Sequence, residues 1–240
     1  MPFVTGVGWI SAQSMGQGRK NTSFQMDSGE LPSISRKAVF KSLYPRFSRM
    51  DEFSKLGVSA IGLALQDAGL DGKISKRGAG IVVTTLYGCL HTDLDYFETV
   101  TPENGSFASP ALFSYTLPNC FLGEAASRFG LTGPGYVVSR QGGSDLSSTR
   151  AVLEDMDSDD FESALAGICD LGCPPDFPMD VKMIPGAAFV MVEKNPDVGL
   201  KPYGSLYLNP AQEIFFNDKK VSGFRALIRA CIKQIPGMVA

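Results

Sequence analysis

The sequence has 240 residues, of which 44% are hydrophobic, with a formal net charge of −3 and a pI of about 5.3. This composition supports one substantial core, and the slightly acidic balance argues against a nucleic-acid-binding protein, which usually carries a basic excess. The first residues lack the features of a signal peptide, and no apolar run approaches the roughly 20 residues of a membrane span. We therefore expect a cytoplasmic protein without a membrane partner.

The N-terminal quarter begins with a predicted strand over residues 3–11. Residues 12–48 are rich in Gly, Ser, Lys and Pro, show no clean period, and predict an excursion with little regular structure. Five basic residues in this excursion predict a solvated surface segment, or less readily a contact for an acidic partner such as a carrier protein. They are Arg36, Lys37, Lys41, Arg46 and Arg49.

Apolar residues recurring at helical spacing predict a helix over residues 48–69. Ser48 with Asp51 three positions later matches a capping box at its start, and Gly69 marks its end.

Strands and helices alternate along the rest of the chain. Further strands are predicted at 78–88, 136–139, 161–170, 186–194 and 201–208, and further helices at 117–130, from Ser144 onward, and at 221–235. This alternation predicts an α/β layered fold with a mixed sheet, organised as one domain over residues 1–240.

The residues offer little conventional chemistry. His91 is the one histidine, and its closeness to Cys89 in the sequence fits a loop or helix start better than a catalytic dyad. Cys169 and Cys173 lack the spacing and partners of a tetrahedral zinc site, so we expect no metal. The glycines of residues 6–11 lack the third glycine of a dinucleotide fingerprint, so we expect no cofactor.

The stretch 133–145, GPGYVVSRQGGSD, predicts a strand that ends at a glycine-rich bend before a helix. Several enzyme families hold a nucleophile at such a bend. Here the bend carries Gln141 and Gly142, neither of which is a nucleophile. Ser139 or Ser144 would need a base, and only His91 could supply one.

Three segments, in this order and spacing, resemble β-ketoacyl-acyl-carrier-protein synthases. They are RMDEFSKLGVSAIGLALQDAGL (49–70), SFASPALFSYTLPNCFLGEAASRFGLTGPGYVVS (106–139) and VKMIPGAAFVMVEK (181–194). The likeness extends from about residue 3 to residue 195 and implies a thiolase-like fold, in which two similar halves are layered α/β/α/β/α and the protein dimerises. Most of this chain would then correspond to the N-terminal half, with 196–240 a remnant of the second.

Two departures from the family imply a loss of catalysis. Alignment from the Gly-Pro turn puts Gly142 at the position of the catalytic cysteine, and a one-residue gap puts Gln141 there. The second alignment resembles chain-length factors, the cysteine-free partners of type II polyketide ketosynthases. The family's two catalytic histidines and lysine belong to the second half, whose absence would also leave apolar surface exposed and favour obligate association.

The resemblance therefore implies a non-catalytic subunit in a heterodimer with a catalytic ketosynthase, with an acyl carrier protein docking mainly on that partner. Strand 136–139 would run beside its counterpart in the partner, and the helix after residue 117 would shape the tunnel for the acyl chain. The implied interface and tunnel residues are Leu117, Asn119, Phe121, Tyr136, Val137, Val138, Ser139 and Arg140.

Two alternatives remain open at this point. One is a malonyl-carrier-protein decarboxylase that relies on Gln141, and the other is a homodimeric scaffold. The product, whether an aromatic polyketide, an aryl polyene or a fatty acid, is also open.

Overall fold

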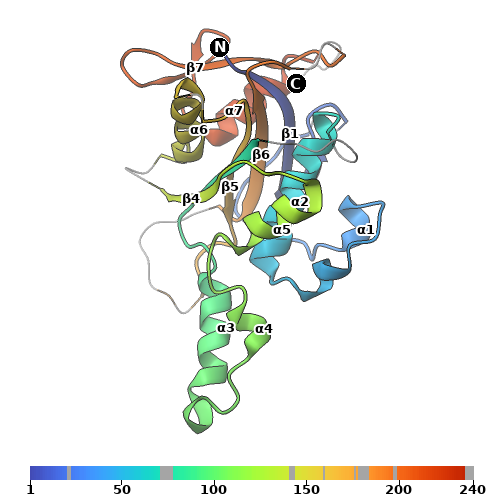
Figure 1. Ribbon diagram of the computed structural model, residues 1–240, viewed down its shortest axis with the longest axis vertical. Helices are drawn as coiled ribbons and strands as arrows, with labels where there is room; N and C mark the ends of the chain where they lie inside the picture. Colours follow the sequence, from blue (N-terminus) through green and yellow to red (C-terminus); the bar gives the residue numbers. More distant parts are fainter. Residues whose placement is uncertain are drawn as a thin grey trace.

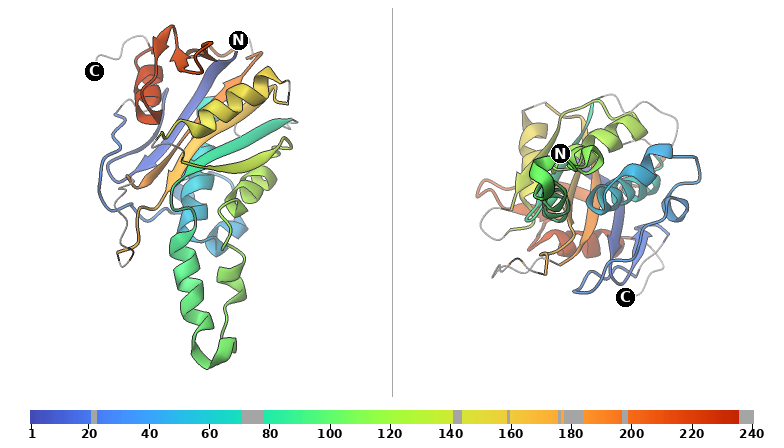
Figure 2. Two further views of the ribbon diagram at one scale, coloured as in Figure 1. Left: turned by 90° about the vertical axis from the view of Figure 1, so that its left-hand side faces the viewer. Right: turned by 90° about the horizontal axis from the view of Figure 1, so that it is seen from below.

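A computed structural model describes residues 1–20, 23–70, 78–140, 144–158, 160–175, 177, 184–196 and 199–235. A single twisted sheet runs through the body of the molecule with helices on both faces, and a helical arm projects beyond one end (Figures 1 and 2). The layered α/β prediction is therefore confirmed.

The described residues contribute nine strands to this sheet, in the spatial order β4-β3-β5-β6-β1-β7-β8-β9, with β2 pairing β1. The strands are β1 (Phe3–Ser11), β2 (Met15–Gln17), β3 (Ala79–Thr85), β4 (Gly135–Ser139), β5 (Ser163–Asp170), β6 (Gly186–Glu193), β7 (Gly204–Leu208), β8 (Ile214–Phe216) and β9 (Lys219–Lys220). The predicted strands are confirmed, whereas the short strands β2, β8 and β9 were not predicted.

The sheet is mixed, as predicted. Strand β3 runs parallel to β4 and to β5, while β5–β6 and β6–β1 are antiparallel. In the β3–β4 pair, Ile81 lies opposite Gly135 and Thr85 lies opposite Ser139. The carboxyl ends of β3, β4 and β5 therefore lie together at one end of the sheet.

The helices cover both faces of the sheet. They are α1 (Arg36–Val39), α2 (Glu52–Asp67), α3 (Leu90–Val100), α4 (Pro110–Phe113), α5 (Cys120–Phe129), α6 (Ser147–Asp157) and α7 (Phe224–Ile232), with 3₁₀ turns η1 (Pro45–Arg49) and η2 (Pro102–Gly105). One core lies between the sheet and α2 with α5, and the other between the sheet and α6 with α7. Strand β6 shows why both cores form, because its apolar run over residues 187–192 sends alternate side chains to opposite faces.

Helix α2 begins differently from the predicted capping box. Asp51 is its N-cap, and the Asp51 carboxylate accepts a hydrogen bond from the Ser54 amide at 3.0 Å. Ser48 lies in η1 and donates to the carbonyl of Pro45, so it is not available as the cap. Gly69 follows the helix with φ +70°, which confirms it as the stop.

Strand β1 explains the two glycines that resemble part of a dinucleotide fingerprint. A Cβ at Gly6 would lie 2.3 Å from the carbonyl oxygen of Ala64, and one at Gly8 would lie 2.2 Å from the Ala64 nitrogen. The glycines therefore allow α2 to pack directly on the strand, which is a structural role.

Two of the predicted helix boundaries require correction. Helix α5 begins at Cys120 rather than residue 117, because Leu117 and Pro118 precede its first turn and Asn119 is its N-cap. Helix α6 begins at Ser147 rather than near Ser144, whose hydroxyl accepts from the Leu146 amide in the preceding turn.

The C-terminal segment belongs to the same body of structure. Strand β7 pairs with β1, and α7 packs its apolar face into the core on the α6 side. The organisation as one domain over residues 1–240 and the origin of residues 196–240 as a remnant of a second half both stay predictions.

A buried carboxylate joins the start and the end of the chain. Asp67, at the end of α2, accepts hydrogen bonds from the Val7 amide at 2.8 Å, the Arg19 amide at 2.7 Å and the Tyr203 hydroxyl at 2.7 Å. The Arg19 guanidinium also lies over the Tyr203 ring, 4.6 Å from its centroid. This network fixes β7 against β1 and α2.

Candidate interaction site

Asp170 organises the end of the sheet at which β3, β4 and β5 terminate. This carboxylate accepts from the Thr85 hydroxyl at 2.9 Å and from the amides of Leu86 at 3.0 Å and Tyr87 at 2.9 Å. Burial raises the pKa of Asp170, although these hydrogen bonds oppose the rise. Asp170 thus fixes the turn that leads from β3 into the arm.

Cys89 and His91, at the base of the arm, contact different partners. His91 Nε2 lies 3.1 Å from the carbonyl oxygen of Gly172, whereas the Cys89 thiol points to the Asp93 carboxylate, at 3.5 Å from Oδ2. Burial, together with Asp93, raises the pKa of Cys89 to about 12. The two side chains therefore do not form a dyad, and the thiol is held protonated.

Strand β4 is the edge strand of the sheet at this end, since no other strand in the described part of the chain pairs with it. The Pro134 carbonyl accepts from Ile81 at 3.0 Å and the Arg140 amide donates to Thr85 at 3.1 Å, so even-numbered residues direct their main-chain groups towards β3. The N–H and C=O groups of the odd-numbered residues point to the open side. These residues are Gly135, Val137 and Ser139.

The side chains of β4 alternate between the two cores. Tyr136 and Val138 pack towards α6, and Val137 packs towards α2 and α5. The Tyr136 hydroxyl donates to Asp155 of α6, and burial followed by this contact raises the pKa of Tyr136. The strand is thus anchored by its side chains while its outer main-chain edge stays open. Gln141 and Gly142 lie outside the described residues.

The arm comprises residues 90–117 and carries four exposed large hydrophobic side chains. Phe97 is 62% exposed, Phe107 is 69% exposed, and Phe113 and Leu117 are each 62% exposed. Only four other large hydrophobic side chains are exposed among the described residues. An apolar cluster of this kind on a projecting element is typical of a protein–protein interface. The sequence analysis missed these phenylalanines, since an amphipathic pattern alone does not separate a core face from an exposed one.

The three predicted tunnel residues differ in exposure. Leu117 is exposed at the end of the arm, and Asn119 is exposed at the N-cap of α5. Phe121 is fully buried, with its ring 5.3 Å from that of Phe53 in an edge-to-face arrangement and closely packed on Gly57. Their roles in a tunnel stay a prediction.

The face covered by α6 and α7 is polar on its outer side. Glu154 and Asp157 are exposed on α6, and Arg229 of α7 and Lys233, which follows it, are also exposed. The exposed apolar surface that we expected is found on the arm, which carries four of the eight exposed large hydrophobic side chains described.

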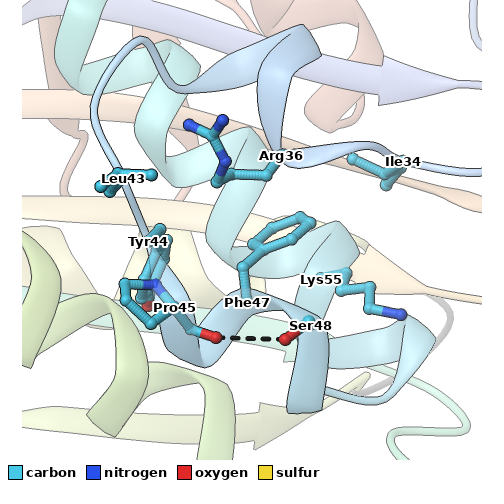
Figure 3. Close-up of a pocket in the computed structure, with 8 residues that line it drawn as sticks. All are labelled: Ile34, Arg36, Leu43, Tyr44, Pro45, Phe47, Ser48 and Lys55. Carbon is cyan, nitrogen blue, oxygen red and sulfur yellow. Dashed lines mark hydrogen bonds between the residues drawn. The ribbon is translucent and has the colours of Figure 1, made fainter.

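The basic excursion forms a surface pocket of about 620 Å³ between η1, α1 and the start of α2 (Figure 3). Its cations are largely engaged within the chain. Arg36 donates to the carbonyls of Phe40 at 3.1 Å and Ser42 at 2.7 Å, and Lys55 pairs with Glu52 at 2.7 Å. The pocket is lined by Ile34, Arg36, Leu43, Tyr44, Pro45, Phe47, Ser48 and Lys55.

Arg46, from the same excursion, pairs with a buried carboxylate. Its guanidinium lies 2.7 Å from Glu124 Oε1 on α5, and the Tyr115 hydroxyl donates to the same oxygen at 3.3 Å. Glu124 thus joins η1, α5 and the segment that follows α4.

The remaining cysteines and the acidic groups do not assemble a metal centre. Cys169 is buried in β5, and the Cys173 thiol lies 3.0 Å from the carbonyl oxygen of Phe177. Across the described ranges, no three or more His, Cys, Asp or Glu residues are grouped in a way that could hold a metal ion. The helices described are also all too short or too polar to cross a membrane.

This arrangement defines a class of protein. A mixed sheet with helices on both faces is the layered arrangement of the thiolase-like fold of ketosynthases. Residues 33–178 match the model of the "Beta-ketoacyl synthase, N-terminal domain". The chain belongs to the β-ketoacyl synthase family. No curated protein matches the sequence.

Solved structures share this fold. The ishigamide ketosynthase/chain length factor is 16% identical with a TM-score of 0.65, and the match covers 85% of this chain and 65% of that one. The complex AntDE:AntF, a type II polyketide synthase acyl-carrier protein with its ketosynthase, is 20% identical with a TM-score of 0.64, covering 85% and 67%. The ketosynthase ApeO with its chain length factor ApeC from Xenorhabdus doucetiae is 14% identical with a TM-score of 0.55, covering 81% and 79%. The chain therefore spans about two thirds of the length of the first two.

Proposed function

We propose that this chain is a non-catalytic subunit that pairs with a catalytic ketosynthase and shapes its acyl tunnel, as a chain-length factor does. The observation that carries the proposal is the open edge of β4 beside an apolar arm. The arm leaves the sheet just after Thr85, which lies opposite Ser139 at the end of β4. Main-chain pairing along β4 and burial of the arm would then create one continuous interface.

The non-catalytic part of the proposal is supported by the thiols. None of the four residues directly after β4 is a cysteine: they are Arg140, Gln141, Gly142 and Gly143. Burial raises the pKa of Cys89, Cys120, Cys169 and Cys231, so these thiols are poor nucleophiles at neutral pH. His91, the one histidine in the sequence, is hydrogen-bonded to the carbonyl oxygen of Gly172.

The tunnel part of the proposal rests on Leu117. This exposed side chain follows α4 and precedes α5, where it can project into a neighbouring subunit. A longer acyl chain would have to displace a packed side chain, at a cost of about 1–3 kcal/mol. The acyl carrier protein would dock mainly on the catalytic partner.

The test uses coexpression with a catalytic ketosynthase from the same source. Val137→Pro removes an outward N–H and should abolish the complex, whereas Val137→Ala keeps the N–H and should preserve it. Leu117→Ala should lengthen the product of the complex. Pairing that survives Val137→Pro would contradict the β4 interface, and unchanged product length would contradict the tunnel role.

The catalytic alternative is tested on the chain alone. The purified chain should not decarboxylate a malonyl thioester. Turnover that is lost in Gln141→Ala would replace the proposal with a decarboxylase.

A further inference from the structure

The arm lies within a stretch of the chain that carries no positive side chain. Between residues 78 and 127 the sequence contains no Lys or Arg, but it contains five acidic residues. Glu124 is buried and paired with Arg46, and Asp93 faces Cys89 at the root of the arm. The acidic charge is therefore not neutralised from within this stretch.

Two of the acidic side chains are exposed on α3. Asp95 and Glu98 lie three residues apart, and neither pairs with a cation among the described residues. Tyr96 packs on Phe113 of α4, with ring centroids 5.5 Å apart, and so α3 and α4 hold one another as a unit. Asp95 and Glu98 stay in solvent beside Phe97, whose ring is also exposed.

We propose that the arm is an acidic, aromatic docking element that selects a protein partner whose apolar groove is rimmed by Lys and Arg side chains. The inference rests on the proposed function and specifies the chemistry of the surface that receives the arm. Phe97, Phe107 and Phe113 would fill the groove, and Asp95 and Glu98 would meet its basic rim. Complementary charge of this kind steers association and excludes wrong partners.

The same charges disfavour two other occupants of the arm. An arm-to-arm contact with a second copy would bring Asp95 and Glu98 of both copies together, and like charges repel. An acidic rim also disfavours an anionic lipid surface, which attracts basic segments. A basic partner protein is therefore the occupant that the charge pattern favours.

The experiment measures association rates between the full chain and the ketosynthase at about 0.1 M and about 1 M salt. The double variant Asp95→Lys/Glu98→Lys should associate about tenfold more slowly at the lower salt. The difference should vanish at the higher salt, where the Debye length falls from about 10 Å to about 3 Å. Urea unfolding of the variant checks that it is folded.

The control is Asp27→Lys/Glu30→Lys, which has the same residue types, spacing, exposure class and change in net charge, although Asp27 also lies 4.0 Å from the Arg225 guanidinium. These residues lie in the loop after β2, which pairs with β1, four strands from β4. The control should associate at the wild-type rate. Equal slowing of both variants, or of neither, overturns the selective role of the arm.

Equilibrium pull-down separates this inference from the proposed function. If the wild type binds the ketosynthase and Asp95→Lys/Glu98→Lys associates at the same rate, the proposed pairing is retained and the charge-based selection is overturned. A stable homodimer that persists in Asp95→Lys/Glu98→Lys and excludes the ketosynthase overturns both.

Discussion

The contact between Gly57 and Phe121 offers a sharp test of the core beneath the proposed interface. A Cβ added at Gly57 would lie 2.6 Å from two ring atoms of Phe121, which is closer than van der Waals contact allows. Gly57→Ala should therefore incur an overpacking cost of about 1–3 kcal/mol. Because alanine has a higher helix propensity than glycine, the substitution would also stabilise α2 by about 1 kcal/mol, so the net destabilisation is about 0–2 kcal/mol.

Removing the ring should reverse the sign of this effect. Phe121→Ala alone should lower the free energy of unfolding by about 3–5 kcal/mol, because the side chain is fully buried against Phe53. In that background, Gly57→Ala meets no ring and should stabilise the protein by about 1 kcal/mol. The coupling between the two substitutions is then about 1–3 kcal/mol.

Urea unfolding of the wild type, both single variants and the double variant measures this coupling. The reasoning is refuted if the two effects add to within about 0.5 kcal/mol, the value typical of residues that do not touch. Leu117→Ala, at an exposed site, should leave stability almost unchanged. It is therefore a cleaner probe of product length than Phe121→Ala.

Three further predictions concern buried polar groups and thiols. Asp67→Ala leaves Tyr203 and two amides without an acceptor and should cost about 3 kcal/mol or more in urea unfolding; a loss below 1 kcal/mol, the scale of a single net hydrogen bond, would contradict the network. Burial raises the pKa of Asp170 in the folded chain above 3.8. The contribution of Asp170 to the free energy of unfolding is therefore full below pH 3.8 and declines as the pH rises through the raised pKa. The stability advantage of the wild type over Asp170→Asn should therefore shrink with rising pH, and a growing advantage would show the opposite shift. Cys89, with a pKa of about 12, should resist alkylation by iodoacetamide at neutral pH, as peptide mapping can show, and rapid modification would reveal a thiolate.

The main elements could be predicted because their signals are local. The apolar spacing of α2 and the continuous apolar run of β3 each indicate a structure that tertiary packing then reinforces. Gly69 could be predicted as a helix stop because only a residue that tolerates φ +70° fits there. The resemblance to ketosynthases added the fold as a whole.

The errors arise where a local pattern competes with tertiary structure. Ser48 and Asp51 match a capping box, but Pro45 starts a 3₁₀ turn that includes Ser48, so Asp51 becomes the cap. Gly6 and Gly8 match part of a nucleotide motif, but they serve the close approach of Ala64.

The site was only partly predictable for a related reason. Strand β4 was identified from its sequence and its family, but its open edge depends on strand order, which no local pattern encodes. The exposure of Phe97 and Phe113 depends in the same way on the arm projecting beyond the sheet (Figure 2). Asp170 acts through three hydrogen bonds to a segment more than 80 residues away in sequence.

Amide hydrogen exchange along β4, with and without the ketosynthase, tests the central claim most directly. The account predicts that Gly135, Val137 and Ser139, whose N–H groups face the open edge, become strongly protected in the complex. Tyr136 and Val138, already directed towards β3, should change much less. A complex in which the three outward amides exchange as fast as in the free chain would contradict pairing through this strand.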